Sequence, residues 1–132
     1  MQVLINIDVP DLEQGIAFYQ RALPLTLARR MFDGTVAEMR AENVRIYLLE
    51  KPQGSAPFTH AEARDYGRHW TPVHLDFAVG DIETALTQAL KAGAKQETEV
   101  DRAEWGAIVT LSDPFGNGFC LVRFEGGVYE HV

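Results

Sequence analysis

The chain has 132 residues, with 46% hydrophobic and 23% charged residues, which fits one globular domain or two half-size modules sharing a core. Its net charge of −7 argues against binding to nucleic acid, because phosphates need a basic surface, and is compatible with neutral or cationic small molecules. No apolar run approaches the roughly 20 residues that span a bilayer, no secretory signal is recognisable, and a single cysteine fits a reducing cytoplasm.

The first fifty residues predict a strand, a helix and three more strands. Residues 2–9 alternate between apolar and polar positions, and Asp11 is a good helix N-cap, with Gln14 at the capping-box spacing. Apolar residues then recur at helical intervals until Pro24. Residues 26–32 and 35–41 predict two strands joined at Asp33-Gly34, and Asn43 introduces a further strand that ends near Glu50.

Residues 51–71 interrupt this pattern with prolines, glycines and several aromatic and histidine residues. A loop of this length is often a binding loop or a lid. A linker whose aromatic residues pack against the body explains the composition equally well. Both interpretations remain open at this point.

The second module repeats the first. Residues 73–79 predict a strand, Asp81 caps a helix, and Gly93 stands where a C-terminal cap belongs. Strands are expected at about 95–103, 106–112 and 118–125, with a turn at 113–117. We therefore expect modules at 1–50 and 72–126, a connecting loop or lid at 51–71 and a tail at 127–132.

Several motifs, in this order, resemble the vicinal oxygen chelate superfamily of glyoxalases, extradiol dioxygenases and bleomycin-resistance proteins. They are Val9-Pro10-Asp11-Leu12, Ile16-Ala17-Phe18-Tyr19, Val79-Gly80-Asp81-Ile82, Trp105-Gly106 and Asp113-Pro114-Phe115-Gly116-Asn117. The resemblance implies an α+β fold of two βαβββ modules, whose strands form a curved, cup-like mixed sheet with the helices outside. It also implies a homodimer and a ligand site inside the cup.

Metal-dependent members of the superfamily take ligands from the first and last strands of each module. The corresponding positions in this chain are Leu4, Tyr47, His74 and Cys120, with Tyr47 placed to within one or two residues. Leucine cannot bind a metal and tyrosine is a poor ligand, so a standard site is not expected. His74 and Cys120 would form half of a zinc, nickel, iron or manganese site, to which Asp76 and Asp8 could add oxygens.

His74 is the main catalytic candidate, because an inward-facing histidine beside Asp76 can act as a general base, a ligand donor or a metal ligand. A hydrogen-bonded core histidine is the alternative. Cys120 is expected to be a small buried side chain rather than a thiolate, because no cationic residue is adjacent in sequence.

The remaining candidates would bind a ligand rather than react with it. Aromatic rings suit stacking on a flat molecule or filling a core, and Arg45 suits an anion or a solvated rim. Carboxylates would oppose positive charge on a ligand. The ligand-binding candidates are Asn6, Asp8, Arg45, Tyr47, Trp70, Asp76, Cys120 and Phe124.

The favoured function is binding of a small molecule in the cup without a metal or other cofactor, as in bleomycin-resistance-like proteins. A metal-dependent lyase or dioxygenase with an atypical site around His74 is the second hypothesis. A non-catalytic interaction scaffold is the third, and the fold alone does not choose among them. Nucleic acid and membranes are not expected as partners.

Overall fold

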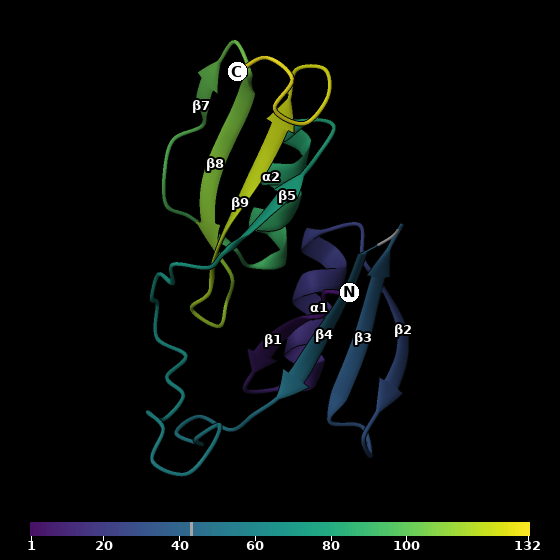
Figure 1. Cartoon of the computed structure of the whole chain (residues 1–132), viewed down its shortest axis with the longest axis vertical. Coiled ribbons are helices and arrows are strands. Elements are labelled where there is room, and N and C mark those ends of the chain that lie inside the picture. Colours follow the sequence, from purple (N-terminus) through teal and green to yellow (C-terminus); the bar gives the residue numbers. More distant parts are fainter. Residues whose placement is uncertain (43) are drawn as a thin grey trace. The chain divides into compact units, whose positions relative to one another are not determined.

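The computed structural model describes residues 1–42 and 44–132, so the prediction that Asn43 introduces a strand falls outside the described residues. The chain divides into two compact units, Met1–Gly67 and Arg68–Val132, and each is considered by itself. Both units contain one helix and a mixed sheet (Figure 1). The expected α+β class with two βαβββ modules is confirmed.

Unit 1 has a four-stranded sheet with one helix against it. In chain order its elements are β1 (Ile5–Val9), α1 (Leu12–Ala22), β2 (Thr26–Met31), β3 (Val36–Ala41) and β4 (Val44–Glu50). The sheet order is β1-β4-β3-β2, with β1 parallel to β4 and the other pairs antiparallel. Figure 1 shows α1 against one face of this sheet. We call the opposite side the open face of unit 1.

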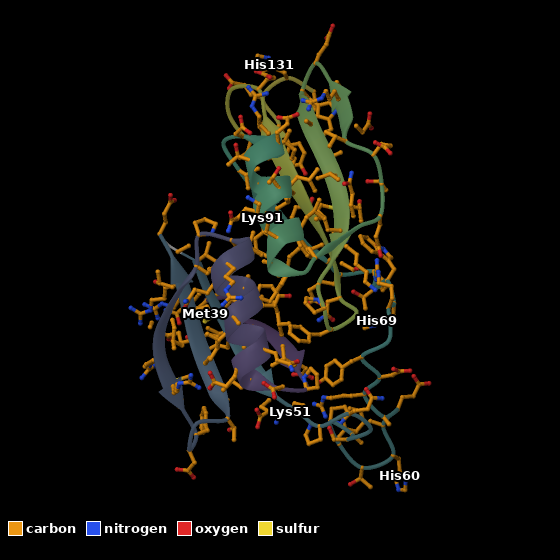
Figure 2. The ribbon with its side chains drawn as sticks, turned by 180° about the vertical axis from the view of Figure 1, so that it is seen from behind. Met39, Lys51, His60, His69, Lys91 and His131 are labelled. Carbon is orange, nitrogen blue, oxygen red and sulfur yellow. The ribbon has the colours of Figure 1, made fainter. Side chains whose placement is uncertain are left out.

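The core of unit 1 lies between α1 and the sheet. Met39, Ile46 and Leu48 are fully buried there, as their alternation along β3 and β4 requires (Figure 2 labels Met39 beside α1). A Cβ added at Gly15 would lie 3.1 Å from both Cγ atoms of Val9. Glycine at this position therefore lets the helix approach β1 closely.

Unit 2 repeats this arrangement with five strands. Its elements are β5 (Leu75–Ala78), α2 (Ile82–Ala92), β6 (Lys95–Gln96), β7 (Asp101–Ala103), β8 (Gly106–Ser112) and β9 (Gly118–Phe124). The order is β5-β9-β8-β6, with β7 also paired to β8 and β5 parallel to β9. Along β5, Leu75 and Phe77 alternate with Asp76 and Ala78, and Asp76 pairs with Cys120 of β9. We call the side of this sheet away from α2 the open face of unit 2.

One predicted strand of unit 2 is wrong in detail. Residues 95–103 form two short strands, β6 and β7, instead of a single strand. Between them the Thr98 hydroxyl accepts the backbone N–H of Thr110 at 3.0 Å, in place of a main-chain carbonyl. A side chain that takes over a ladder hydrogen bond interrupts the strand at that point.

The segment 51–71 is divided between the units. Residues 51–67 form an ordered loop of unit 1, closed by hydrogen bonds from Gly54 N to Arg64 O (2.9 Å) and from Arg64 N to Ser55 O (2.8 Å). Figure 2 shows this loop, which carries Lys51 at its start and His60. The residues after Gly67 belong to unit 2.

Candidate functional site

Strand pairing places equivalent positions of the two units on their open faces. In unit 1, Asn6 of β1 pairs with Tyr47 of β4, and in unit 2, Asp76 of β5 pairs with Cys120 of β9. Tyr47 is thus the counterpart of Cys120. This register removes the one- or two-residue uncertainty that the sequence left at Tyr47.

The open face of unit 2 brings three potential ligand groups together. Single donor atoms from His74, Asp76 and Cys120 all lie within 4.8 Å of one another. The His74 Nε2 atom is 3.3 Å from the Asp76 Oδ1 atom, and both side chains are about one-third exposed. The arrangement joins an accessible imidazole and an accessible carboxylate with a buried thiol.

Trp70 completes this group. Its ring centroid lies 4.7 Å from that of His74 at an interplanar angle of 40°, and the residue is 50% exposed. The guanidinium carbon of Arg68 lies 5.7 Å from the indole centroid. An indole with half of its surface in water offers area for stacking on a ligand.

The loop before β5 is held by the turn between β8 and β9. The backbone N–H of His69 donates to the Gly116 carbonyl at 3.1 Å, and His69 forms a β-bridge with Asn117. Within that turn, Asp113 Oδ1 accepts the backbone N–H groups of Phe115 and Asn117. The Asp-Pro-Phe-Gly-Asn turn thereby fixes the segment that carries Trp70.

Gly118 provides the surface against which Trp70 lies. A Cβ at this position would be 2.6 Å from Cε3 and 2.7 Å from Cζ3 of the indole. These distances are far below the 3.5–4.0 Å of ordinary carbon contacts. The absence of a side chain at Gly118 is what lets the ring come this close to β9.

Cys120 is 4% exposed, as expected of a small buried side chain. Burial raises the pKa of its thiol, and the nearby Asp76 carboxylate raises it further. The Thr110 hydroxyl lies 3.5 Å from the sulfur. Without a bound cation, Cys120 is therefore a neutral thiol at physiological pH.

Phe124 lies apart from this group. Its ring contacts Tyr129, with centroids 4.9 Å apart, and Trp105, with centroids 6.1 Å apart. It forms an aromatic cluster at the end of β9 instead of lining the surface around His74. This cluster ties the C-terminal tail to the sheet.

On the open face of unit 1, Arg45 pairs in register with Arg40, and Tyr47 lies beside a carboxylate that the sequence did not single out. Glu38 of β3 is completely buried, and it accepts hydrogen bonds from the Tyr47 hydroxyl (3.0 Å) and from Arg40 Nε (2.8 Å). Arg29 Nη2 lies 3.6 Å from Glu38 Oε1. Burial alone would raise the pKa of Glu38, but the tyrosine hydrogen bond and the two guanidinium groups together lower it.

Asp8 and Asn6, also predicted to bind a ligand, have different surroundings. Asp8 accepts a hydrogen bond from Arg64 Nε at 2.7 Å, and Arg64 also reaches the Ser55 hydroxyl at 3.2 Å. Asn6 is exposed. The charge of Asp8 is thus already compensated from within the chain, and no local sequence signal connects it to a residue 56 positions away.

The sequence model of the glyoxalase-like domain family matches residues 4–122 of the chain. The chain belongs to the glyoxalase-like domain family. The resemblance to the vicinal oxygen chelate superfamily is thereby confirmed. No curated protein shows significant sequence similarity to the chain.

Solved structures of glyoxalase-like proteins share the fold. The fosfomycin resistance protein FosX from Listeria monocytogenes superposes with a TM-score of 0.73 at 16% identity, covering 98% of this chain and 95% of its own. A glyoxalase family protein from Bacillus cereus gives 0.73 at 19% identity, covering 95% and 94%. A glyoxalase/bleomycin resistance protein/dioxygenase family enzyme from Burkholderia phytofirmans gives 0.69 at 15% identity, covering 92% and 97%. At these identities the likeness concerns the fold alone.

The residues around His74 fit a divalent metal by the chemistry of their donors. Zinc bonds of about 2.0–2.3 Å place tetrahedral ligands roughly 3.3–3.8 Å apart. Donor atoms that already lie within 4.8 Å of one another need to converge by only about 1 Å to reach that spacing. Three protein ligands with an open fourth position is the pattern of catalytic zinc sites.

No helix among the described residues combines the length and the apolar character needed to cross a membrane.

Proposed function

We propose that the glyoxalase-like chain binds a small organic molecule at the group formed by Trp70, His74 and Asp76. The proposal rests on one observation. A half-exposed indole packs at a 40° tilt against an accessible imidazole, which in turn lies 3.3 Å from a carboxylate. Planar stacking area next to a few polar groups is typical of small-molecule sites.

The chemistry of these residues indicates the kind of ligand. The indole favours a flat or aromatic ring. Arg68 already lies over the indole, 5.7 Å from its centroid, so a basic group of the ligand would be placed beside Asp76 rather than over Trp70. The Asp76 carboxylate would accept a hydrogen bond from an amino or other cationic group, and His74 would donate to or accept from a polar substituent. A flat aromatic molecule with a basic group matches all three residues, and the negative net charge of the chain adds a weak attraction.

Tryptophan fluorescence tests this proposal. The chain has two tryptophans, Trp70 and Trp105. In a Trp105→Phe background the emission reports Trp70 alone, so flat aromatic cations and cationic glycopeptides that bind there should quench it saturably. Asp76→Asn in the same background should weaken binding of a cationic ligand, whereas Asp65→Asn, an exposed carboxylate of unit 1, should not. A panel without any saturable ligand would refute the proposal.

A metal-dependent activity is the second candidate, favoured by the three converging donors at His74, Asp76 and Cys120. A divalent ion held there would polarise oxygens of a substrate and stabilise a developing negative charge. It would also require Cys120 to lose its proton. His74 is the residue placed to hold or move a substrate proton, because Asp76 orients its imidazole.

Elemental analysis of protein purified without a metal-binding tag or chelators separates the two candidates. The metal hypothesis predicts about one equivalent of zinc, nickel, iron or manganese per chain, lost in His74→Ala and in Cys120→Ser. His60→Ala is the matched control, because His60 is an exposed histidine of unit 1. Metal-free protein from medium supplemented with all four ions would argue against this candidate and leave the first in place.

The proposal also includes a cytoplasmic homodimer. The single cysteine supports a reducing compartment, and dimerisation follows from the family resemblance. Light scattering coupled to size-exclusion chromatography tests the dimer: a mass near 29 kDa supports it, since one chain has a mass of 14.7 kDa, and a mass near 15 kDa refutes it.

A further inference from the structure

The open face of unit 1 carries three arginines on adjacent strands. Arg40 of β3 pairs in register with Arg45 of β4, and Arg29 of β2 pairs with Glu38. These side chains alternate with the buried Met39 and the rest of the core, so they project away from α1.

Among the residues that the structure describes, Glu38 is the carboxylate that contacts this group of arginines. Glu38 contacts Arg40 and Arg29, while Arg45 lies directly across from Arg40. Like charges at directly opposed positions destabilise a pair of strands. An anion bound between them would remove that repulsion.

The arginines are also positioned in advance. Both Nε and Nη2 of Arg40 lie 2.8 Å from Glu38 Oε2, which fixes the plane of the guanidinium and leaves its Nη1 group for another acceptor. The side chains of Arg29 and Arg40 are 61% and 48% exposed, whereas that of Glu38 is completely buried beneath them. A buried carboxylate thus holds accessible guanidinium groups in place, which lowers the entropy cost of binding.

We propose that Arg29, Arg40 and Arg45 form a binding site for a small oxyanion, a phosphate or carboxylate group, on the open face of unit 1. Guanidinium groups match the geometry of both groups through paired hydrogen bonds. The net charge of −7 opposes a polyanion such as DNA, so the site serves a small ligand. It lies in a different unit from Trp70 and His74, and the two proposals can fail separately.

Adjacent arginines of β2 supply a matched pair of variants. Arg29 lies on the open face, whereas Arg30 points to the other side, where it forms an ion pair with Glu13 at 2.6 Å. Arg29 and Arg30 are each replaced by glutamine in separate variants. A third variant, Arg45→Gln, is added because it leaves every contact of Glu38 intact. Inorganic phosphate is titrated by calorimetry at constant ionic strength.

Arg29→Gln and Arg45→Gln should each weaken phosphate binding roughly three- to tenfold, whereas Arg30→Gln should leave it unchanged. Equal losses in all three variants would show a general charge effect and overturn the site, as would the absence of phosphate and acetate binding to the wild-type chain. A parallel titration with acetate distinguishes a carboxylate ligand from a phosphate ligand. Binding of either anion that is weakened in Arg29→Gln and Arg45→Gln supports the site. Tighter binding of a short DNA duplex than of both small anions would overturn the small-ligand assignment.

Discussion

Replacing Gly118 by alanine tests the geometry around Trp70 without altering any proposed ligand-binding residue. The new methyl group would lie 2.6 Å from the indole and 2.7 Å from Arg68 Nη2, so both side chains must move outward by about 1 Å to reach ordinary contact distances. Trp70 is half exposed and has room to move. We expect the contact between Trp70 and His74 to open while the fold persists.

Two opposing terms set the magnitude of this change. Exchanging glycine for alanine at a compatible backbone conformation stabilises a protein by about 0.4–1 kcal/mol through the unfolded chain. Overpacking costs about 1–3 kcal/mol. Gly80→Ala is the matched control, because a Cβ there meets nothing within 4 Å. The difference between the two variants isolates the steric cost, which we place at about 1–2 kcal/mol because the displaced ring is accessible to solvent.

Urea unfolding gives the stability difference, and fluorescence in the Trp105→Phe background reports the environment of Trp70. We expect a red-shifted emission and weaker ligand binding in Gly118→Ala, and neither effect in Gly80→Ala. Unchanged emission together with unchanged affinity in Gly118→Ala would show that Trp70 does not rest on Gly118, and would refute a ligand site built on this position of the indole.

Further predictions concern the sheets and the thiol. Gly106→Ala should abolish stable folding in a thermal melt, because its Cβ would lie 1.9 Å from the Arg123 carbonyl oxygen at a φ of +150°; a cooperative transition near that of the wild type would contradict this. The pKa of Glu38 is lowered from its ordinary 4.5, so its ionised form stabilises the fold above that pH and this contribution disappears as the pH falls through the lowered value. Urea unfolding between about pH 7 and pH 3 should therefore show a steeper loss for the wild type than for Glu38→Gln, and parallel curves would refute it. Burial raises the pKa of Cys120, so iodoacetamide should alkylate the native thiol far more slowly than the urea-unfolded one, and equal rates would show an open thiolate.

Local signals in the sequence predicted the ends of the helices correctly. Asp11 and Asp81 accept the backbone N–H groups of Gln14 and Thr84, with nearly identical backbone angles. Gly93 adopts the left-handed conformation, at a φ of 115°, that a C-cap glycine provides. These features depend on a few neighbouring residues, which is why a single sequence is enough to recognise them.

The surroundings of Glu38 and Asp8 could not be predicted from the sequence, because they depend on contacts between residues far apart in the chain. The sequence analysis did not single out Glu38, because its complete burial depends on Tyr47 of β4, Arg29 of β2 and Arg40 of its own strand. Asp8 was expected to face a ligand, yet Arg64 comes back from the loop of unit 1 to pair with it. In both cases the register of the sheet or the path of a loop determines the partner.

The proximity of Trp70 to His74 also depended on structure. Sequence reasoning selected both residues separately, because one is an aromatic residue before a strand and the other a histidine at the start of it. Their tilted ring contact results from the bridge between His69 and Asn117 and from the missing side chain at Gly118. A glycine beside the turn at 113–117 was the available signal, but nothing local connects it to Trp70.

Chemical-shift mapping of an isotope-labelled chain tests the central proposal most directly. A flat aromatic cation is titrated into the protein while the backbone amide signals are followed. The account predicts saturable shifts concentrated at residues 68–76 and 118–120, with weaker shifts in a His74→Ala variant. Saturable shifts confined to other parts of the chain, or equal shifts in the variant, would contradict ligand binding at Trp70, His74 and Asp76.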